Sequence, residues 1–249
     1  MLKYTFKNGH TTFVEYIKPK LEKTQNFTVV YTHGFCSDPM GRKPEAVKKW
    51  CVENGMGFFR YEIAGHGSDV QNFEKTTLET YKMQVFEIIE NIVEENVIVM
   101  GASLGGWLSL LAGIRYPHKV KGMIGLAAAP DFLKTFMDKY FNEEHKKALE
   151  NDGKILFPTN DFCYTITKEM IESAEDNLLL NKECIDFEGK VRLYQGMNDA
   201  ALDWKVAPLI AQKLKSNDVR VVLSKDSNHR LGSDEDIKNI LDLLDDFLR

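Results

Sequence analysis

The sequence predicts an α/β fold in which a mostly parallel sheet carries helices on both faces. Short apolar, β-branched runs alternate with longer segments whose apolar residues recur at helical spacing, and this alternation is typical of such a sheet. The chain has 249 residues, of which 43% are apolar and 28% charged, enough for a globular protein with a large core. No internal repeat or low-complexity linker interrupts the sequence, so we expect a single domain over residues 1–249.

The expected strands follow from local signals. Asn8-Gly9 is a hairpin turn signal between two short runs at the start of the chain. Later strands are short apolar runs, and the run over 27–31 leads to His33-Gly34. The strands expected in order cover about residues 2–6, 12–17, 27–31, 58–61, 97–100, 120–126, 191–194 and 219–223.

The expected helices lie between these strands. A first helix covers about 43–53, and the second begins at a capping box in which Glu79 follows Thr76 by three residues. A helix over 104–116 is apolar on most faces and therefore central. Two more helices cover about 203–215 and the C-terminal segment, where Ile237, Ile240 and Leu244 share one face.

The strand rhythm stops between about residues 131 and 185. We expect no strand there, but a helical cap insertion over the sheet edge where open α/β folds bind ligands. A second cap helix is expected over 167–180. An apolar stripe either lines a site for an acyl or aryl group or only packs the cap onto the sheet, and it consists of Phe132, Phe136, Met137, Tyr140 and Phe141.

The stretch Gly101-Ala102-Ser103-Leu104-Gly105 fits the pattern G-x-S-x-G. An expected strand leads into it and an expected helix follows, which is the setting of a nucleophile elbow with Ser103 as nucleophile. The alternative is a turn of small residues whose serine caps the helix.

Serine needs a base, and the base needs an acid that orients it. His229, in the loop after strand 219–223, is the expected base, and Asp199, after strand 191–194, is the expected acid. Asp203 and Asp226 are the rival acids, and Asp203 fits better as a helix cap. His66 in the stretch 65–68 would serve as base only if His229 lay elsewhere.

An acyl transfer also needs two N–H donors for the oxyanion. We expect one from Leu104, the residue after the nucleophile, and the other from Phe35 in the loop that begins with His33-Gly34. Gly34 would let the backbone turn tightly there.

Four longer stretches resemble the α/β-hydrolases of the serine-hydrolase type. They are 61–68 (YEIAGHGS), 101–107 (GASLGGW), 193–199 (LYQGMND) and 224–231 (SKDSNHRL). Within that superfamily they are similar to the subfamily of the mitochondrial palmitoyl-protein thioesterase, also described as an acyl-glucuronide esterase. The resemblance implies an α/β-hydrolase fold, a triad of Ser103, Asp199 and His229, and hydrolysis of carboxylic esters or thioesters through an acyl-enzyme without a cofactor.

The alternatives are a catalytically inactive binding module and a peptidase of the same fold. The sequence shows no acidic pair in the cap dedicated to a substrate amine, and its acids there are expected to form a solvated helix surface. Substrates in the leading interpretation are small-molecule or acyl-protein esters and thioesters, and the oligomeric state is left open.

Charge and cysteine usage limit the partners and the compartment. The net charge of −5 argues against nucleic acid as a partner, and no apolar run approaches the length of a membrane span. The four cysteines lack CxxC spacing, so we expect no metal site and mostly free thiols, with one disulfide left open. Because no signal-peptide core or mitochondrial leader is apparent, we expect a cytoplasmic protein.

Overall fold

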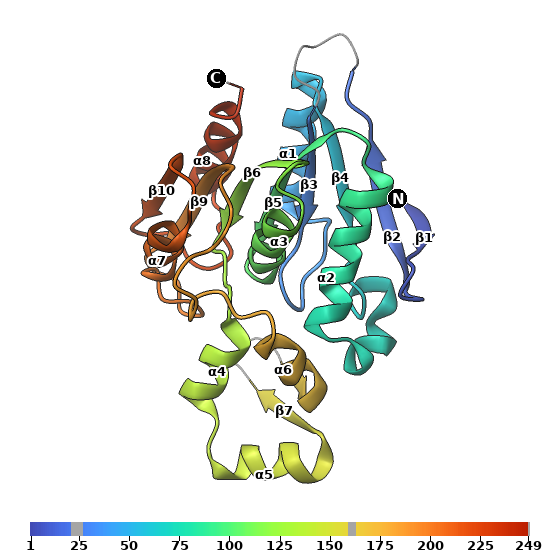
Figure 1. Cartoon of the computed structure of the whole chain (residues 1–249), viewed down its shortest axis with the longest axis vertical. Coiled ribbons are helices and arrows are strands. Elements are labelled where there is room, and N and C mark those ends of the chain that lie inside the picture. The colour runs from blue at the N-terminus through green and yellow to red at the C-terminus, as the bar shows by residue number, and fades with distance from the viewer. Residues whose placement is uncertain (21–26, 159–162, 249) are drawn as a thin grey trace.

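The predicted α/β fold is confirmed by a computed structural model that describes residues 1–20, 27–158 and 163–248, with the backbone alone at 157–158 and 163–164 (Figure 1). Eight strands of the described chain form one sheet in the order β1-β2-β4-β3-β5-β6-β9-β10. These strands are β1 (Leu2–Thr5), β2 (Thr11–Ile17), β3 (Phe27–Thr32), β4 (Gly57–Tyr61), β5 (Asn96–Ala102), β6 (Val120–Leu126), β9 (Lys190–Gly196) and β10 (Val219–Ser224). The pairs β1–β2 and β2–β4 are antiparallel and the others are parallel.

Helices cover both faces of this sheet. They are α1 (Arg42–Asn54), α2 (Leu78–Glu87), α3 (Leu104–Arg115), α7 (Val206–Lys213) and α8 (Asp234–Asp245), with a 3₁₀ helix η1 (Gly67–Lys75) and a π-helix η2 (Ile88–Ile92). Side chains alternate along the buried strands, so that Val30 and Val99 pack with α2 and α3, whereas Val29 and Ile98 pack with α1 and α8. Strands buried on both faces are typical of parallel sheets.

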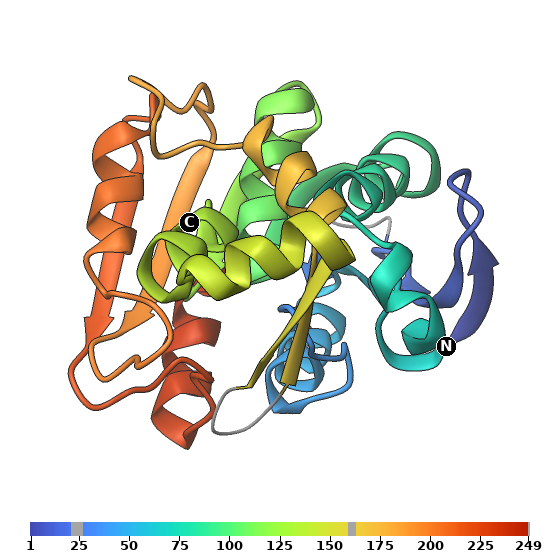
Figure 2. The ribbon, with the colours of Figure 1, turned by 90° about the horizontal axis from the view of Figure 1, so that it is seen from below.

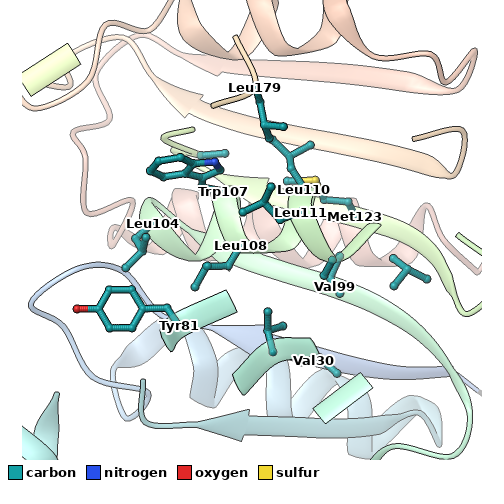
Figure 3. Packing of buried hydrophobic residues seen from close by; sticks show 14 of the residues in the cluster. Val30, Tyr81, Val99, Leu104, Trp107, Leu108, Leu110, Leu111, Met123 and Leu179 are labelled. Atoms are coloured by element: carbon teal, nitrogen blue, oxygen red, sulfur yellow. The ribbon is translucent and has the colours of Figure 1, made fainter. Parts of the chain in front are cut away.

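The central helix α3 carries the larger of the two apolar cores. Figure 3 shows Leu108 and Leu110 of α3 among side chains from the sheet, and Trp107 beside Leu179 of the segment that returns from the cap. Trp107 is fully buried, and its indole N–H donates to the carbonyl of Asn177 at 3.1 Å. Residues 104–113 of α3 are all buried, so the helix that follows Ser103 is packed on every side over this length.

The segment between β6 and β9 differs from the expectation of helices alone. It contains α4 (Phe132–Tyr140), α5 (Glu143–Asp152) and α6 (Lys168–Glu175), but also an antiparallel hairpin of β7 (Lys154–Pro158) and β8 (Cys163–Thr167). The expectation of no strand was wrong because these two runs are only five residues long and their pairing partner is each other. The predicted second cap helix is also shorter than 167–180, because the chain leaves the helix after Glu175. Seen from below, α4 and α5 lie across the end of the sheet (Figure 2).

Helix α2 begins one residue later than the predicted capping box. Thr77 is the N-cap residue and exchanges hydrogen bonds with Thr80. Thr76 is buried, and its hydroxyl bonds to the carbonyl of Phe73 at 2.7 Å and to Tyr81. The sequence pattern missed this because Thr76 and Thr77 are equally good caps and tertiary burial chooses between them.

No helix in the described ranges combines the length and the apolar character that crossing a membrane requires.

Candidate active site

Ser103 stands on a strained turn between β5 and α3. Its φ of 52° lies in a region that residues other than glycine rarely adopt. The turn is possible because its glycines leave room, since a Cβ on Gly101 would lie 2.0 Å from the carbonyl oxygen of Gly105 and one on Gly105 would lie 2.1 Å from that of Thr32. Backbone strain of this kind is concentrated at functional sites.

The structure brings the three expected triad side chains together. His229 Nε2 lies 3.1 Å from Ser103 Oγ, and His229 Nδ1 lies 2.7 Å from Asp199 Oδ2. The side chain of Asp199 is fully buried, whereas that of His229 is 29% exposed. The carboxylate therefore fixes Nδ1–H as the donor and leaves Nε2 as an acceptor for the serine hydroxyl.

The Asp199 carboxylate is held by several donors. Oδ1 accepts the backbone N–H groups of Ala201 at 2.9 Å and Leu202 at 2.8 Å, and Oδ2 accepts the amide of Gln195 at 2.9 Å. Burial by itself would raise the pKa of this carboxyl, but the hydrogen bond and charge of His229, with the Leu202 and Gln195 donors, hold the pKa below its usual value. Asp199 is thus kept ionised beside the imidazole.

The loop that carries His229 is tied to the end of β9. The N–H of Asn198 donates to the carbonyl of Ser227 at 3.0 Å, and a Cβ on Gly196 would lie 2.1 Å from that same oxygen. The buried carboxylate of Asp236 accepts hydroxyl hydrogen bonds from Ser227 at 2.5 Å and from Tyr194 at 2.6 Å. These contacts set the separation between the acid and the base.

Helix α1 holds the same loop from the other side. Arg42 donates to the carbonyl of Gly232 at 2.8 Å, and the ammonium of Lys43 donates to that of Arg230. Burial lowers the pKa of the Lys43 ammonium. Two backbone carbonyls within three residues of His229 are therefore held from α1.

The rival residues lie in other settings. Asp203 accepts the N–H of Lys205 at 3.0 Å in the turn before α7, and Asp226 is exposed. His66 is buried, its Nδ1–H donates to the carbonyl of Ala64 at 2.9 Å, and burial lowers its pKa. Its ring packs against the aromatic side chains of Phe35, Phe73 and Tyr81, so it forms part of the wall behind the loop at residue 35.

The loop after β3 lies against Ser103, as the oxyanion expectation requires. A Cβ on Gly34 would lie 3.3 Å from the Cβ of Ser103. His33 holds the loop, because its Nδ1–H donates to the carbonyl of Gly34 at 2.8 Å while its Nε2 accepts the N–H of Ile63 at 3.0 Å. Burial lowers the pKa of His33 to about 3, so it is neutral. Phe35 follows in this loop, and Leu104 begins α3, where N–H groups have no carbonyl partner within the helix.

Sequence reasoning missed Gln195 and Asp236. Gln195 bonds to Asp199, and Asp236 bonds to Ser227 in the loop that carries His229. Gln195 could have been found as a polar residue within a short buried run of β9. Asp236 lies at the third position of α8 in a capping box with Ser233, and the sequence gives no sign that its side chain also reaches Tyr194.

The apolar stripe of the cap divides into two parts. Phe132 packs against Phe35 with ring centroids 5.5 Å apart and against Trp107 at 6.1 Å. Phe136, Met137 and Phe141 instead pack in a small core within the cap, and Tyr140 is 42% exposed. Most of the stripe therefore packs within the cap itself. Among the described ring contacts, Phe132 is the stripe residue that touches Phe35.

The described side chains contain neither a metal-ligand cluster nor a disulfide. Within the described ranges, no cluster of three or more His, Cys, Asp or Glu side chains is arranged to hold a metal ion. Cys36, Cys51 and Cys184 are free thiols. The side chain of Cys163 lies outside the described residues.

Comparisons with known proteins identify relatives of this chain by sequence and by structure. A family model described as serine aminopeptidase, S33, matches residues 23–151. The human protein named palmitoyl-protein thioesterase ABHD10, mitochondrial, is 33% identical over 226 residues, which cover 88% of this chain and 72% of that protein. The solved structure of mouse alpha/beta hydrolase domain-containing protein 10 has a TM-score of 0.88 at 29% identity and covers 99% of this chain and 97% of its own. A putative hydrolase from Agrobacterium vitis S4 shares the fold, with a TM-score of 0.90 at 21% identity and coverage of 100% and 97%.

These relatives confirm the resemblance inferred from the sequence motifs, but they contradict the expected compartment. The matched proteins from cattle, human, orangutan, rat and mouse are all named as mitochondrial. The expectation of a cytoplasmic protein was therefore wrong. It rested on the lack of an apparent signal peptide or mitochondrial leader, with the expected free thiols in agreement, and neither observation excludes a mitochondrial location.

Proposed function

Because this chain belongs to the α/β-hydrolases, in the family described as serine aminopeptidase, S33, we propose that it is a serine hydrolase that cleaves carboxylic esters or thioesters through an acyl-enzyme. The observation that carries the proposal is the continuous chain of hydrogen bonds from Asp199 through His229 to Ser103. Serine is a weak nucleophile without such a base.

In the proposed mechanism His229 Nε2 takes the proton of Ser103 Oγ as that oxygen attacks the substrate carbonyl. The imidazolium then protonates the leaving alcohol or thiol, which departs when the tetrahedral intermediate collapses to the acyl-enzyme. Water attacks the acyl carbonyl with His229 again as base, and the acid is released with Ser103 regenerated. Asp199 remains ionised throughout and stabilises the imidazolium.

The oxyanion of each tetrahedral intermediate would bind to the backbone N–H groups of Leu104 and Phe35. The close approach of Gly34 to Ser103 supports this assignment. Donors that are fixed before the reaction need no rearrangement as charge develops, and the loss of one such donor typically costs about 10²–10³ in rate.

The names of the relatives support acyl thioesters on proteins as a substrate class. The rings of Phe35, Phe73 and Phe132 lie together beside the expected oxyanion loop. An apolar wall there would suit an acyl chain next to the scissile carbonyl.

The cap does not favour the alternative of an aminopeptidase, although the family description names one. A substrate amine would be bound by an acid free to face it. Asp138, Glu143 and Glu172 instead form ion pairs with lysines three or four residues away on their own helices, as expected for a solvated helix surface.

The test is hydrolysis of p-nitrophenyl esters from C2 to C16, of the matching acyl thioesters and of aminoacyl p-nitroanilides. Wild type is compared with Ser103→Ala and with Ser109→Ala, a matched control on the same helix whose buried hydroxyl has no partner. We expect Ser103→Ala to lose at least about 10³-fold in kcat and labelling by a fluorophosphonate, while Ser109→Ala retains both. Equal turnover by wild type and Ser103→Ala would refute the proposal. No turnover and no labelling of the wild type would favour the inactive binding module.

A further inference from the structure

Gln195 is a fully buried residue at the end of β9 that contacts the expected acid directly. Its Nε2 donates to Asp199 Oδ2 at 2.9 Å and to the carbonyl of Gly196 at 3.1 Å. Both partners can only accept hydrogen bonds, so the amide orientation is fixed, with the NH₂ group toward Asp199. The oxygen that it contacts is the one that accepts His229 Nδ1–H at 2.7 Å.

The other end of the same amide is unsatisfied. Gln195 Oε1 is buried and has no hydrogen-bond partner, and a buried polar atom without a partner costs stability. The buried side chains of Val191 and Leu193 on the same strand avoid that cost because they are apolar. An apolar side chain at 195 would avoid it too, so the benefit of the amide comes from its donor contacts, and of these the one to Asp199 reaches the expected triad.

We propose that Gln195 is a positioning residue of the triad, which holds Asp199 Oδ2 against His229 Nδ1–H and stabilises the carboxylate. This inference rests on the proposed function. The two backbone donors fix Oδ1, and Gln195 fixes Oδ2, so the carboxylate plane is set independently of the histidine. His229 is partly exposed and therefore depends on that plane for its alignment with Ser103.

The contact also has a predictable electrostatic effect. The Gln195 donor stabilises the Asp199 anion most when His229 is neutral, because a neutral imidazole binds the same oxygen more weakly through Nδ1–H than the imidazolium does. Removing the donor makes the Asp199–His229 pair bind a proton more readily. The acid limb of the kcat/KM profile, which reports protonation of the free enzyme's base, should therefore move to higher pH.

The test compares wild type with Gln195→Met, which keeps the side-chain length and removes both polar atoms. We expect kcat to fall by about tenfold to a hundredfold, the effect of one hydrogen bond to a charged group, with KM within about twofold. The acid limb should move up by about half a pH unit or more. Tm should change little, because the loss of the donor contacts to Asp199 and Gly196 is offset by the removal of the unpartnered oxygen. Gln84→Met is the matched control, because Gln84 is also fully buried with one unpartnered amide atom but bonds to the N–H of Ala64, and it should leave the limb in place.

Gln195→Glu gives a second measurement if the methionine variant does not fold. It keeps the shape of the side chain but places a second acid beside Asp199, so the acid limb of the kcat/KM profile should move to still higher pH. An unmoved limb in the variant that folds, or a loss of kcat that only follows a loss of Tm, would overturn the positioning role. Ser103→Ala is assayed alongside. If it is inactive while the limb is unmoved, only the role of Gln195 fails, whereas full activity of Ser103→Ala would refute the proposed function itself.

Discussion

Gly34 sets how closely the loop after β3 approaches Ser103. In Gly34→Ala the new Cβ would lie 3.3 Å from Ser103 Cβ and 3.4 Å from the carbonyl oxygen of Ala102, so the loop has to retreat by a few tenths of an ångström. We expect kcat for ester hydrolysis to fall by about tenfold to a hundredfold, because oxyanion donors act only at close range, while Tm changes little. Gly41→Ala is the control, since a Cβ there meets nothing within 4 Å. Equal kcat in both variants would contradict the placement of this loop.

Single residues were predictable where a local sequence motif or a position after a strand indicates their role. Ser103 and Leu104 follow from the elbow pattern, and His229 and Asp199 follow from their places after two strands. Gln195 was not predictable in the same way, because its partner lies four residues away in a loop whose path the sequence does not fix. The structure brings these residues together, and their catalytic roles remain predictions for the assays above.

Among the elements, Asp131 joins the start of the cap to its end. The residue directly before α4 is buried and adopts a left-handed backbone, and its two carboxylate oxygens accept the N–H groups of Leu179 at 2.8 Å and Leu180 at 2.7 Å. Asp131→Ala leaves both donors without this acceptor. We therefore expect the free energy of unfolding to fall by roughly 1–3 kcal/mol and proteolysis within the cap to become faster. Asp138→Ala on α4 removes only an exposed ion pair with Lys134 and should be nearly neutral. A cap equally resistant to proteases in both variants would contradict this role.

The strands of the main sheet were predictable because each is an apolar run between turn signals, and their observed bounds differ from the expected ones by one or two residues in most cases. The hairpin of β7 and β8 was not, because it is short and lies outside the core of the sheet. Helix α2 continues into a wider turn, η2, at residues 88–92, and the apolar spacing of the sequence does not distinguish the two.

For the whole molecule, buried histidines predict how stability depends on pH. His33 is 1% exposed, and burial lowers its pKa to about 3, whereas an unfolded histidine titrates near 6.5. Below pH 6.5 the unfolded chain therefore takes up a proton that the folded protein does not, and stability is lost as the pH falls. The loss amounts to roughly 2 kcal/mol between pH 6.5 and 5, or about 4–8 °C in Tm, and His66, whose pKa burial also lowers, adds to it.

Tm measured from pH 7.5 to pH 5 tests this expectation. His33→Gln removes the titrating group and should be less stable at pH 7.5 but show a flatter decline. His118→Gln, a change at an exposed position, should decline as steeply as the wild type. A wild-type Tm that stays constant down to pH 5 would show that these histidines are protonated in the folded protein.

The contact between Asp131 and residues 179–180 means that the chain leaves the sheet and returns to it at one place. Residues 131 and 179 are 48 positions apart in the sequence but bonded in space. A segment whose ends adjoin can be exchanged as a unit, since its replacement need only present the same two ends. The cap of this protein could thus be exchanged for that of a related protein. Phe132 would travel with the cap, whereas Phe35, Phe73 and the expected triad would stay in the host.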